Sequence, residues 1–187
     1  MVQSRTNTRL ITHALIKAIG LVGAAGAVII APNAAQLFDK LLTRYDQKSA
    51  AKTLASLKYR QLIEVRKVSG QLEYRLTARG WDMFERIQIK DLTIETPTRW
   101  DHRWRVVAFD LPAEYGAQRR QMLKQLHRLE FYKLQDSLWV HPFDCEKQIG
   151  VLLSYLRIEQ FVTFMVVEQG NFVDKAEKYF IERKKLM

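Results

Sequence analysis

A largely apolar run at residues 104–109 (WRVVAF), followed three residues later by Pro112, constrains the fold of this chain most strongly. A short apolar run of this length is typical of a strand that is buried on both faces. Proline cannot continue that strand because it lacks a backbone N–H, and its fixed φ suits the start of a helix. We therefore predict a strand at residues 105–109 and a helix that begins at Ala113.

The elements that follow continue the alternation of strands and helices. Helical and alternating periodicities predict helices at residues 113–129, 145–156 and 172–185, and strands at 131–134, 138–140 and 162–167. Up to residue 167, the order is strand, helix, strand, strand, helix, strand, which is the order of a ferredoxin-like domain. We assign this domain to residues 96–187 and expect it to mediate dimerisation.

In the first half of the chain, the sequence pattern predicts three helices, a short β-hairpin and a fourth helix. Helices are expected at residues 9–31, 34–44 and 47–61, and a fourth begins after Thr77, a residue type that caps helix N-termini. Alternating apolar residues flank Ser69-Gly70, which is typical of a tight β-turn. Gly20, Gly23 and Gly26 recur every three residues and predict a smooth stripe for close packing in the first helix.

These elements predict a winged helix-turn-helix domain at residues 1–95, joined by a linker at residues 91–99. The overall fold class is therefore α+β: an N-terminal winged helix followed by a ferredoxin-like βαββαβ domain.

Charge is distributed unevenly over the two halves. The formal net charge is +10, and residues 1–99 carry 16 Lys and Arg against 8 Asp and Glu. Residues 100–187 carry 14 basic against 12 acidic residues. A polyanionic partner is therefore expected for the first half, and double-stranded DNA fits a winged helix.

The third predicted helix has two distinct faces. Ala50, Leu54 and Leu57 fall on a core face. Side chains that suit phosphates and base edges lie opposite, and the hairpin adds further cations; the candidate DNA contacts are Ser49, Lys52, Ser56, Tyr59, Arg60, Arg66, Lys67 and Arg75. The structural alternative is an ordinary solvated helix face. Residues 40–79 carry 10 basic against 3 acidic residues, which favours the DNA interpretation.

Asp110 ends the first strand of the second domain. A carboxylate there could hold a divalent cation, especially if a dimer brings two copies together, and so activate water for phosphodiester hydrolysis. The structural alternative is that Asp110 stabilises the N-terminus of the following helix.

A second group of ligand-type residues lies at positions 141–146, with His141, Asp144, Cys145 and Glu146. No second Cys or paired His stands at zinc-binding spacing, so we interpret the group as a loop in which Asp144 caps a helix. Cys145 is the only cysteine, which favours a reducing cytoplasm. The apolar stretch at residues 18–31 is shorter than a membrane span of about 17–25 residues, so we expect a buried helix rather than a membrane segment.

Two separated blocks resemble the signature of the PaaX family of bacterial transcription regulators. They read WDHRW at residues 100–104 with FDLP at 109–112, and FYKLQDSLWVHP at 131–142. The resemblance implies a winged helix followed by a domain similar to the small nuclease subunit of CRISPR adaptation (the Cas-two protein), a ferredoxin-like dimer. Family members usually carry a further C-terminal domain, whereas this sequence stops after one terminal helix. We therefore do not expect from this sequence the acyl-CoA sensing that the resemblance would otherwise imply.

Three functions follow from these observations. The first is a homodimeric, sequence-specific DNA-binding regulator, a repressor without cofactor or enzymatic activity. The second is a metal-dependent nuclease using Mg²⁺ or Mn²⁺, in which Asp110, matching a strand-end Asp proposed to bind metal in the CRISPR protein, is catalytic. The third is a membrane-associated or structural interaction protein. The charge split favours the first, because a nuclease should concentrate basic residues in its second domain.

Overall fold

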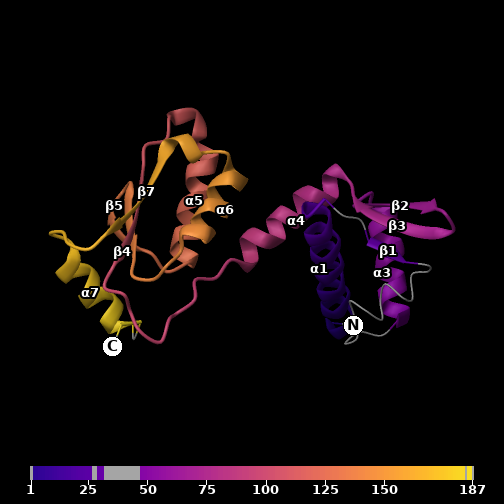
Figure 1. Ribbon diagram of the computed structural model, residues 1–187, viewed down its shortest axis with the longest axis horizontal. Coiled ribbons are helices and arrows are strands. Elements are labelled where there is room, and N and C mark those ends of the chain that lie inside the picture. The colour runs from indigo at the N-terminus through magenta and orange to yellow at the C-terminus, as the bar shows by residue number, and fades with distance from the viewer. Residues whose placement is uncertain (1, 27–28, 32–46, 184, 187) are drawn as a thin grey trace. The chain divides into compact units, whose positions relative to one another are not determined.

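The computed structural model describes residues 2–26, 29–31, 47–183 and 185–186, and the chain divides into two compact units at residues 1–90 and 91–187 (Figure 1). The helix predicted at residues 34–44 lies outside the described residues. Each unit contains helices and one antiparallel sheet, so the predicted α+β class is confirmed. None of the described helices is long and apolar enough to cross a membrane.

The first unit places helices against a three-stranded antiparallel sheet. Its helices are α1 (Val2–Ala24), α3 (Gln47–Tyr59) and α4 (Ala78–Asp91), and its strands are β1 (Ile29–Ala31), β2 (Ile63–Val68) and β3 (Gln71–Leu76). The strand order is β1-β3-β2. One buried apolar cluster joins α1, α3, α4 and the sheet, with Leu15, Leu57 and Tyr74 almost fully buried.

The first predicted helix is too long at its C-terminal end. α1 ends at Ala24, and Gly26 adopts a positive φ of 74° that an α-helix cannot continue through. Ile29 and Ile30 then pair with Tyr74 and Glu73 of β3. β-Branched side chains fit a pleated strand better than a helix, and this pairing overrides the apolar pattern that predicted one continuous helix.

The predicted glycine packing is confirmed at two of the three positions. A Cβ at Gly20 would overlap the ring of Phe84, and one at Gly23 would lie 3.1 Å from the Trp81 ring. The two rings belong to α4, so the glycines let α1 approach this helix closely. Gly26 instead forms part of the turn that ends α1.

The hairpin and the start of α4 follow the predicted local chemistry. Ser69 and Gly70 both have positive φ, at 51° and 80°, as a type I′ turn requires. Thr77 precedes α4, and its Oγ1 accepts a hydrogen bond from the Gly80 N–H at 3.1 Å. That bond satisfies a backbone donor of the first turn, so the predicted N-cap is confirmed.

The second unit has the predicted βαββαβ order. Its elements are β4 (Trp104–Phe109), η1 (Ala113–Tyr115), α5 (Gly116–Arg128), β5 (Tyr132–Gln135), β6 (Leu138–His141), α6 (Glu146–Leu156), η2 (Glu159–Phe161), β7 (Val162–Val167) and α7 (Val173–Glu182). All neighbouring strands are antiparallel in the order β5-β6-β4-β7. This is the ferredoxin-like topology.

Helices cover both faces of this second sheet. Trp104 and Val106 point to one face, where they pack against Phe180 of α7. Trp139 lies on the other face, where its ring meets His127 of α5 at a centroid distance of 4.6 Å. Alternate residues of a strand point to opposite faces, so β4 is buried on both sides, as its apolar run predicted.

The predicted linker is irregular in structure and is held by the second unit. Arg128 donates a hydrogen bond to the Leu92 carbonyl at 2.9 Å, and the Gln148 amide donates one to the Thr93 carbonyl at 3.0 Å. Ile94 packs against the core that α7 covers. These contacts explain why the second unit begins at residue 91.

Candidate nucleic-acid interface

The predicted polar face of α3 is exposed at most of its positions. Ala50, Leu54 and Leu57 are buried, as the helical periodicity predicted. Lys52, Ser56, Tyr59 and Arg60 are exposed, and Tyr59 has 90% of its surface accessible. Tyrosine combines an aromatic face with a hydroxyl group, so this exposed side chain is suited to pack on a sugar or a base edge.

Ser49 differs from the other predicted contacts on this helix because it is only partly exposed. Its carbonyl accepts a hydrogen bond from the Thr53 hydroxyl at 2.8 Å, one turn later. The exposed polar face therefore centres on the C-terminal half of α3.

Two of the three predicted hairpin cations belong to a charge lattice on one face of the hairpin. Arg66 lies 3.1 Å from Glu64 along β2, and Arg75 lies 3.2 Å from Glu73 along β3. The register sets each arginine opposite a glutamate of the other strand. Exposed pairs of this kind contribute only about 0–1 kcal/mol, so a phosphate can compete for either arginine. Lys67 is exposed and pairs in register with Leu72, which places it on the opposite face.

Sequence reasoning missed a set of cations on α4. Arg79, Arg86 and Lys90 are exposed, and together with Arg60 they surround a cleft of the first unit. The signal was present in the sequence, since spacings of seven and four residues bring side chains to one face of a helix.

Asp110 is exposed at the end of β4, beside Phe161, whose carbonyl accepts the Asp110 N–H at 3.0 Å. Neither η1 nor α5 receives a side-chain capping bond at its N-terminus. Asp110 shares a shallow hollow with polar neighbours such as Gln135, Ser137 and Gln160. Among the described residues, no group of three or more His, Cys, Asp and Glu side chains could hold a metal ion.

The segment at residues 141–146 alternates between buried and exposed side chains toward the start of α6. His141 and Cys145 are buried, and burial raises the pKa of the Cys145 thiol to about 12. Asp144 is exposed and its Oδ1 accepts the Glu146 N–H at 3.3 Å, at the first residue of α6. These contacts agree with the interpretation of the group as a loop leading into a helix. The predicted cap at Asp144 is one residue too early, because the N-cap residue is Cys145, which makes no side-chain capping bond.

Burial lowers the pKa of His141 to about 4. The unfolded chain takes up a proton near its usual pKa of about 6.5, whereas the folded protein does not until about pH 4. The unfolded state therefore binds more protons in this window, and the protein should lose stability as the pH falls from 6.5 to 4. The loss should reach roughly 3 kcal/mol, at about 1.4 kcal/mol per pKa unit.

Urea unfolding between pH 7 and 4 measures this dependence. His141→Phe should reduce the pH dependence, because Phe does not titrate and its ring can lie beside Phe131 and Phe180. The variant also loses the acceptor of the Phe143 N–H, which lowers stability at every pH and leaves the slope as the readout. An unchanged slope in His141→Phe would contradict the assignment.

The two sequence blocks that carry the family resemblance contact each other. Trp100 Nε1 and Arg105 Nη1 both donate to the Pro142 carbonyl, at 2.9 and 3.0 Å. Arg105 also forms a double hydrogen bond with the Asp101 carboxylate, at 2.7 and 2.8 Å, and this guanidinium lowers the pKa of Asp101. These hydrogen bonds hold the segment before β4 against the segment after β6. The residues of the two blocks that make them therefore have a structural role.

The ferredoxin-like topology defines the fold class of the second unit, and a comparison with protein families identifies a family that this unit resembles. Residues 97–179 match the model of the family described as the PaaX protein central Cas2-like domain. The matched region contains both sequence blocks and all four strands of the second sheet. The match supports a PaaX-like family. No curated protein sequence matches the chain.

Proposed function

We propose that the protein is a homodimeric, sequence-specific DNA-binding regulator of the PaaX type, a repressor whose first unit is a winged helix. The observation that carries the proposal is the exposed polar face of α3, with Lys52, Tyr59 and Arg60, in a chain whose second unit matches the PaaX central domain. A helix with cations, hydroxyls and one exposed aromatic residue fits the major groove.

The sheet of the first unit supports the winged-helix assignment. Helix α1 is followed by strand β1, and helix α3 is followed by the β2–β3 hairpin. β1 joins the hairpin at β3, so the sheet has the order β1-β3-β2. In such a fold, α3 takes the place of the recognition helix and the β2–β3 turn the place of the wing.

Binding to a labelled duplex, measured by fluorescence anisotropy over a range of salt concentrations, tests the proposal. A protein that neutralises several phosphates shows log K falling linearly with log salt, with a slope of about −0.9 per phosphate contact. Absence of binding at low salt would overturn the proposed function.

We infer that the dimer forms through β7. This strand lies at one end of the sheet order, and Met165 and Val166 of β7 expose 38% and 53% of their surfaces. An apolar edge strand exposes unpaired backbone groups, which a second copy related by a two-fold axis can cover. Light scattering after size exclusion, at tens of micromolar, should therefore give twice the chain mass of 21.9 kDa.

Val166→Glu should shift this protein to the monomer, because it places a charge on the exposed apolar side of β7. Val68→Glu is the matched control: this valine is 46% exposed, on the hairpin of the first unit, and the variant should remain dimeric. A parent chain that is monomeric at this concentration would rule out the dimer.

Asp110 provides the test for nuclease activity. Each chain offers one exposed carboxylate here, and no other acidic side chain among the described residues lines its hollow, so we expect no metal-dependent cleavage of DNA or RNA above background with Mg²⁺ or Mn²⁺. Asp110→Asn should change the free energy of unfolding by less than about 0.5 kcal/mol, as is usual for an exposed substitution. Cleavage that requires metal, persists through repurification and disappears in Asp110→Asn would replace the regulator with a nuclease.

A further inference from the structure

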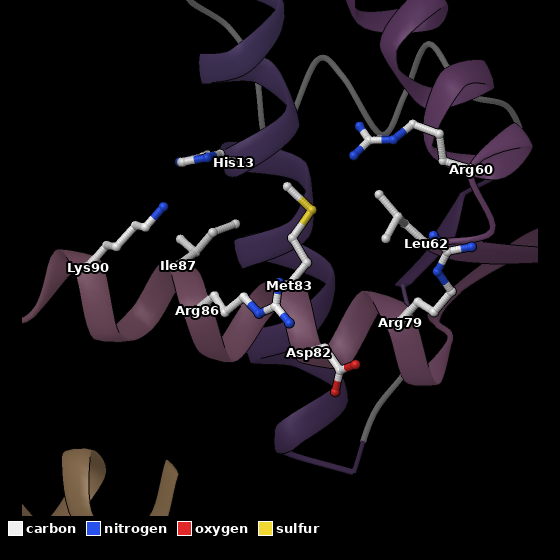
Figure 2. Close-up of a pocket in the computed structure, with 9 residues that line it drawn as sticks. All are labelled: His13, Arg60, Leu62, Arg79, Asp82, Met83, Arg86, Ile87 and Lys90. Carbon is white, nitrogen blue, oxygen red and sulfur yellow. The ribbon is translucent and has the colours of Figure 1, made fainter. Parts of the chain in front are cut away.

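A cleft of the first unit opens between α1, the end of α3 and α4 (Figure 2). Its volume is about 450 Å³, within the range of roughly 300–1,000 Å³ that is usual for small-molecule sites. α4 supplies most of the lining, α1 supplies His13, and the segment after α3 supplies Arg60 and Leu62. All of these residues belong to the first unit, so this unit forms the site by itself.

The lining is strongly cationic. Arg60, Arg79, Arg86 and Lys90 surround the cleft, and Asp82 is the one acidic side chain among the described residues of its lining. In the part of the chain that the structure describes, none of the four cations forms an ion pair. Like charges around one hollow repel each other, and an anion in the hollow removes that repulsion.

The cleft also has an apolar floor. Leu62 and Ile87 are buried and Met83 is partly buried. In Figure 2, Met83 rises from α4 between the two sides of the cleft, while Arg60 reaches toward it from the end of α3 and Lys90 extends toward His13. Cations above an apolar floor fit a small organic anion better than a DNA strand, whose backbone presents phosphates but no apolar body to such a floor.

We propose that this cleft binds a small phosphate monoester with an apolar body. The arginines would hold the phosphate, because a planar guanidinium matches phosphate oxygens with two parallel hydrogen bonds. The apolar body would lie on Leu62, Met83 and Ile87. Four cations and one acid leave three positive charges, which a phosphate monoester, with a charge of about −1.5 to −2 at pH 7, largely neutralises.

Arg60 connects this site with DNA binding. It lines the cleft and also directly follows α3, next to the exposed Tyr59 of the polar face. A ligand that draws Arg60 into the cleft withdraws it from DNA, a consequence that rests on the proposed function. Bound ligand should therefore weaken DNA binding, which gives the first unit a means of regulation.

Isothermal titration of the whole chain with 1-naphthyl phosphate tests the site without DNA. The ester should bind, and 1-naphthol and inorganic phosphate should each bind at least tenfold more weakly, because each lacks one half of the recognised chemistry. Arg86→Gln should weaken binding of the ester at least tenfold. Lys58→Gln removes the same charge from an exposed position of α3 outside the cleft, and its affinity should stay within twofold of the parent.

Asp82→Asn separates loss of binding from loss of fold. It removes the acid from the lining, so the affinity for naphthyl phosphate should rise at least twofold, a gain that a misfolded protein cannot show. Failure of the parent to bind the ester, or equal affinities in Arg86→Gln and Lys58→Gln, would overturn the site. If only duplex DNA binds and Arg86→Gln weakens it, the cleft holds a DNA phosphate and the small-ligand proposal fails. Binding of the ester without DNA binding would leave the site standing and remove the proposed function.

Discussion

The protein carrying both Lys52→Ala and Arg60→Ala should bind duplex DNA at least tenfold more weakly than the parent, a loss of about 1.4 kcal/mol. Both side chains are exposed, Lys52 on the polar face of α3 and Arg60 directly after its end. Each lost phosphate contact should also reduce the slope of log K against log salt by about 1. Anisotropy titrations at several salt concentrations measure both effects.

Lys147→Ala combined with Lys178→Ala is the matched control, because it removes the same charge from exposed positions of the second unit. The affinity of this control for DNA should stay within twofold of the parent, and its salt slope should stay within about 0.5 of the parent's. If the α3 variant binds as the parent does, or both double variants lose affinity equally, α3 is not the recognition helix.

Trp104→Ala should destabilise the second unit by about 3–5 kcal/mol, which is typical for removing a large aromatic side chain from a core. Trp104 is 1% exposed, and its ring lies 5.0 Å from Trp100 and 5.9 Å from Phe180 between ring centroids. It thus fills the space between β4 and α7. Total domain stabilities are about 5–15 kcal/mol, so the loss is a large fraction of what holds this unit together.

Urea unfolding followed by far-ultraviolet circular dichroism measures this effect. One protein concentration is used throughout, because the proposed dimer would make stability depend on concentration. Ile181→Ala is the control on α7: this side chain is 55% exposed, and the change should cost less than about 1 kcal/mol. A Trp104→Ala protein that unfolds within 1 kcal/mol of the parent would contradict the packing of α7 on β4.

The second unit could be predicted almost completely from the sequence because its local signals agree with its tertiary structure. The apolar run at 104–109 is buried on both faces, and β7 has the predicted bounds. The N-terminal region was predicted less well. Ile29–Ala31 continues an apolar helical pattern, and only its pairing with β3, more than 40 residues away, makes it a strand. Such long-range pairing leaves no signal in a local window.

The sequence predicted which residues form the candidate interface, but it did not predict how all of them are arranged in space. Helical periodicity placed Lys52, Ser56 and Tyr59 on one exposed face, as the structure has them. The alternation of side chains along a strand already places Arg66 and Lys67 on opposite faces of the hairpin. Only the register of the hairpin showed that each arginine lies opposite a glutamate of the other strand. The cleft escaped prediction because it brings together side chains from α1, from α4 and from the segment that follows α3.

Selection from a pool of random duplexes with the intact protein tests the central claim most directly, because it detects sequence recognition as well as charge. A dimer with two winged helices should enrich two similar half-sites related by a two-fold axis, and their centres should lie about one helical turn, 10–10.5 base pairs, or a multiple of it apart. The double variant of Lys52 and Arg60 should enrich no sequence. Retained duplexes without any common sequence in the parent selection would contradict the assignment of this protein as a sequence-specific regulator.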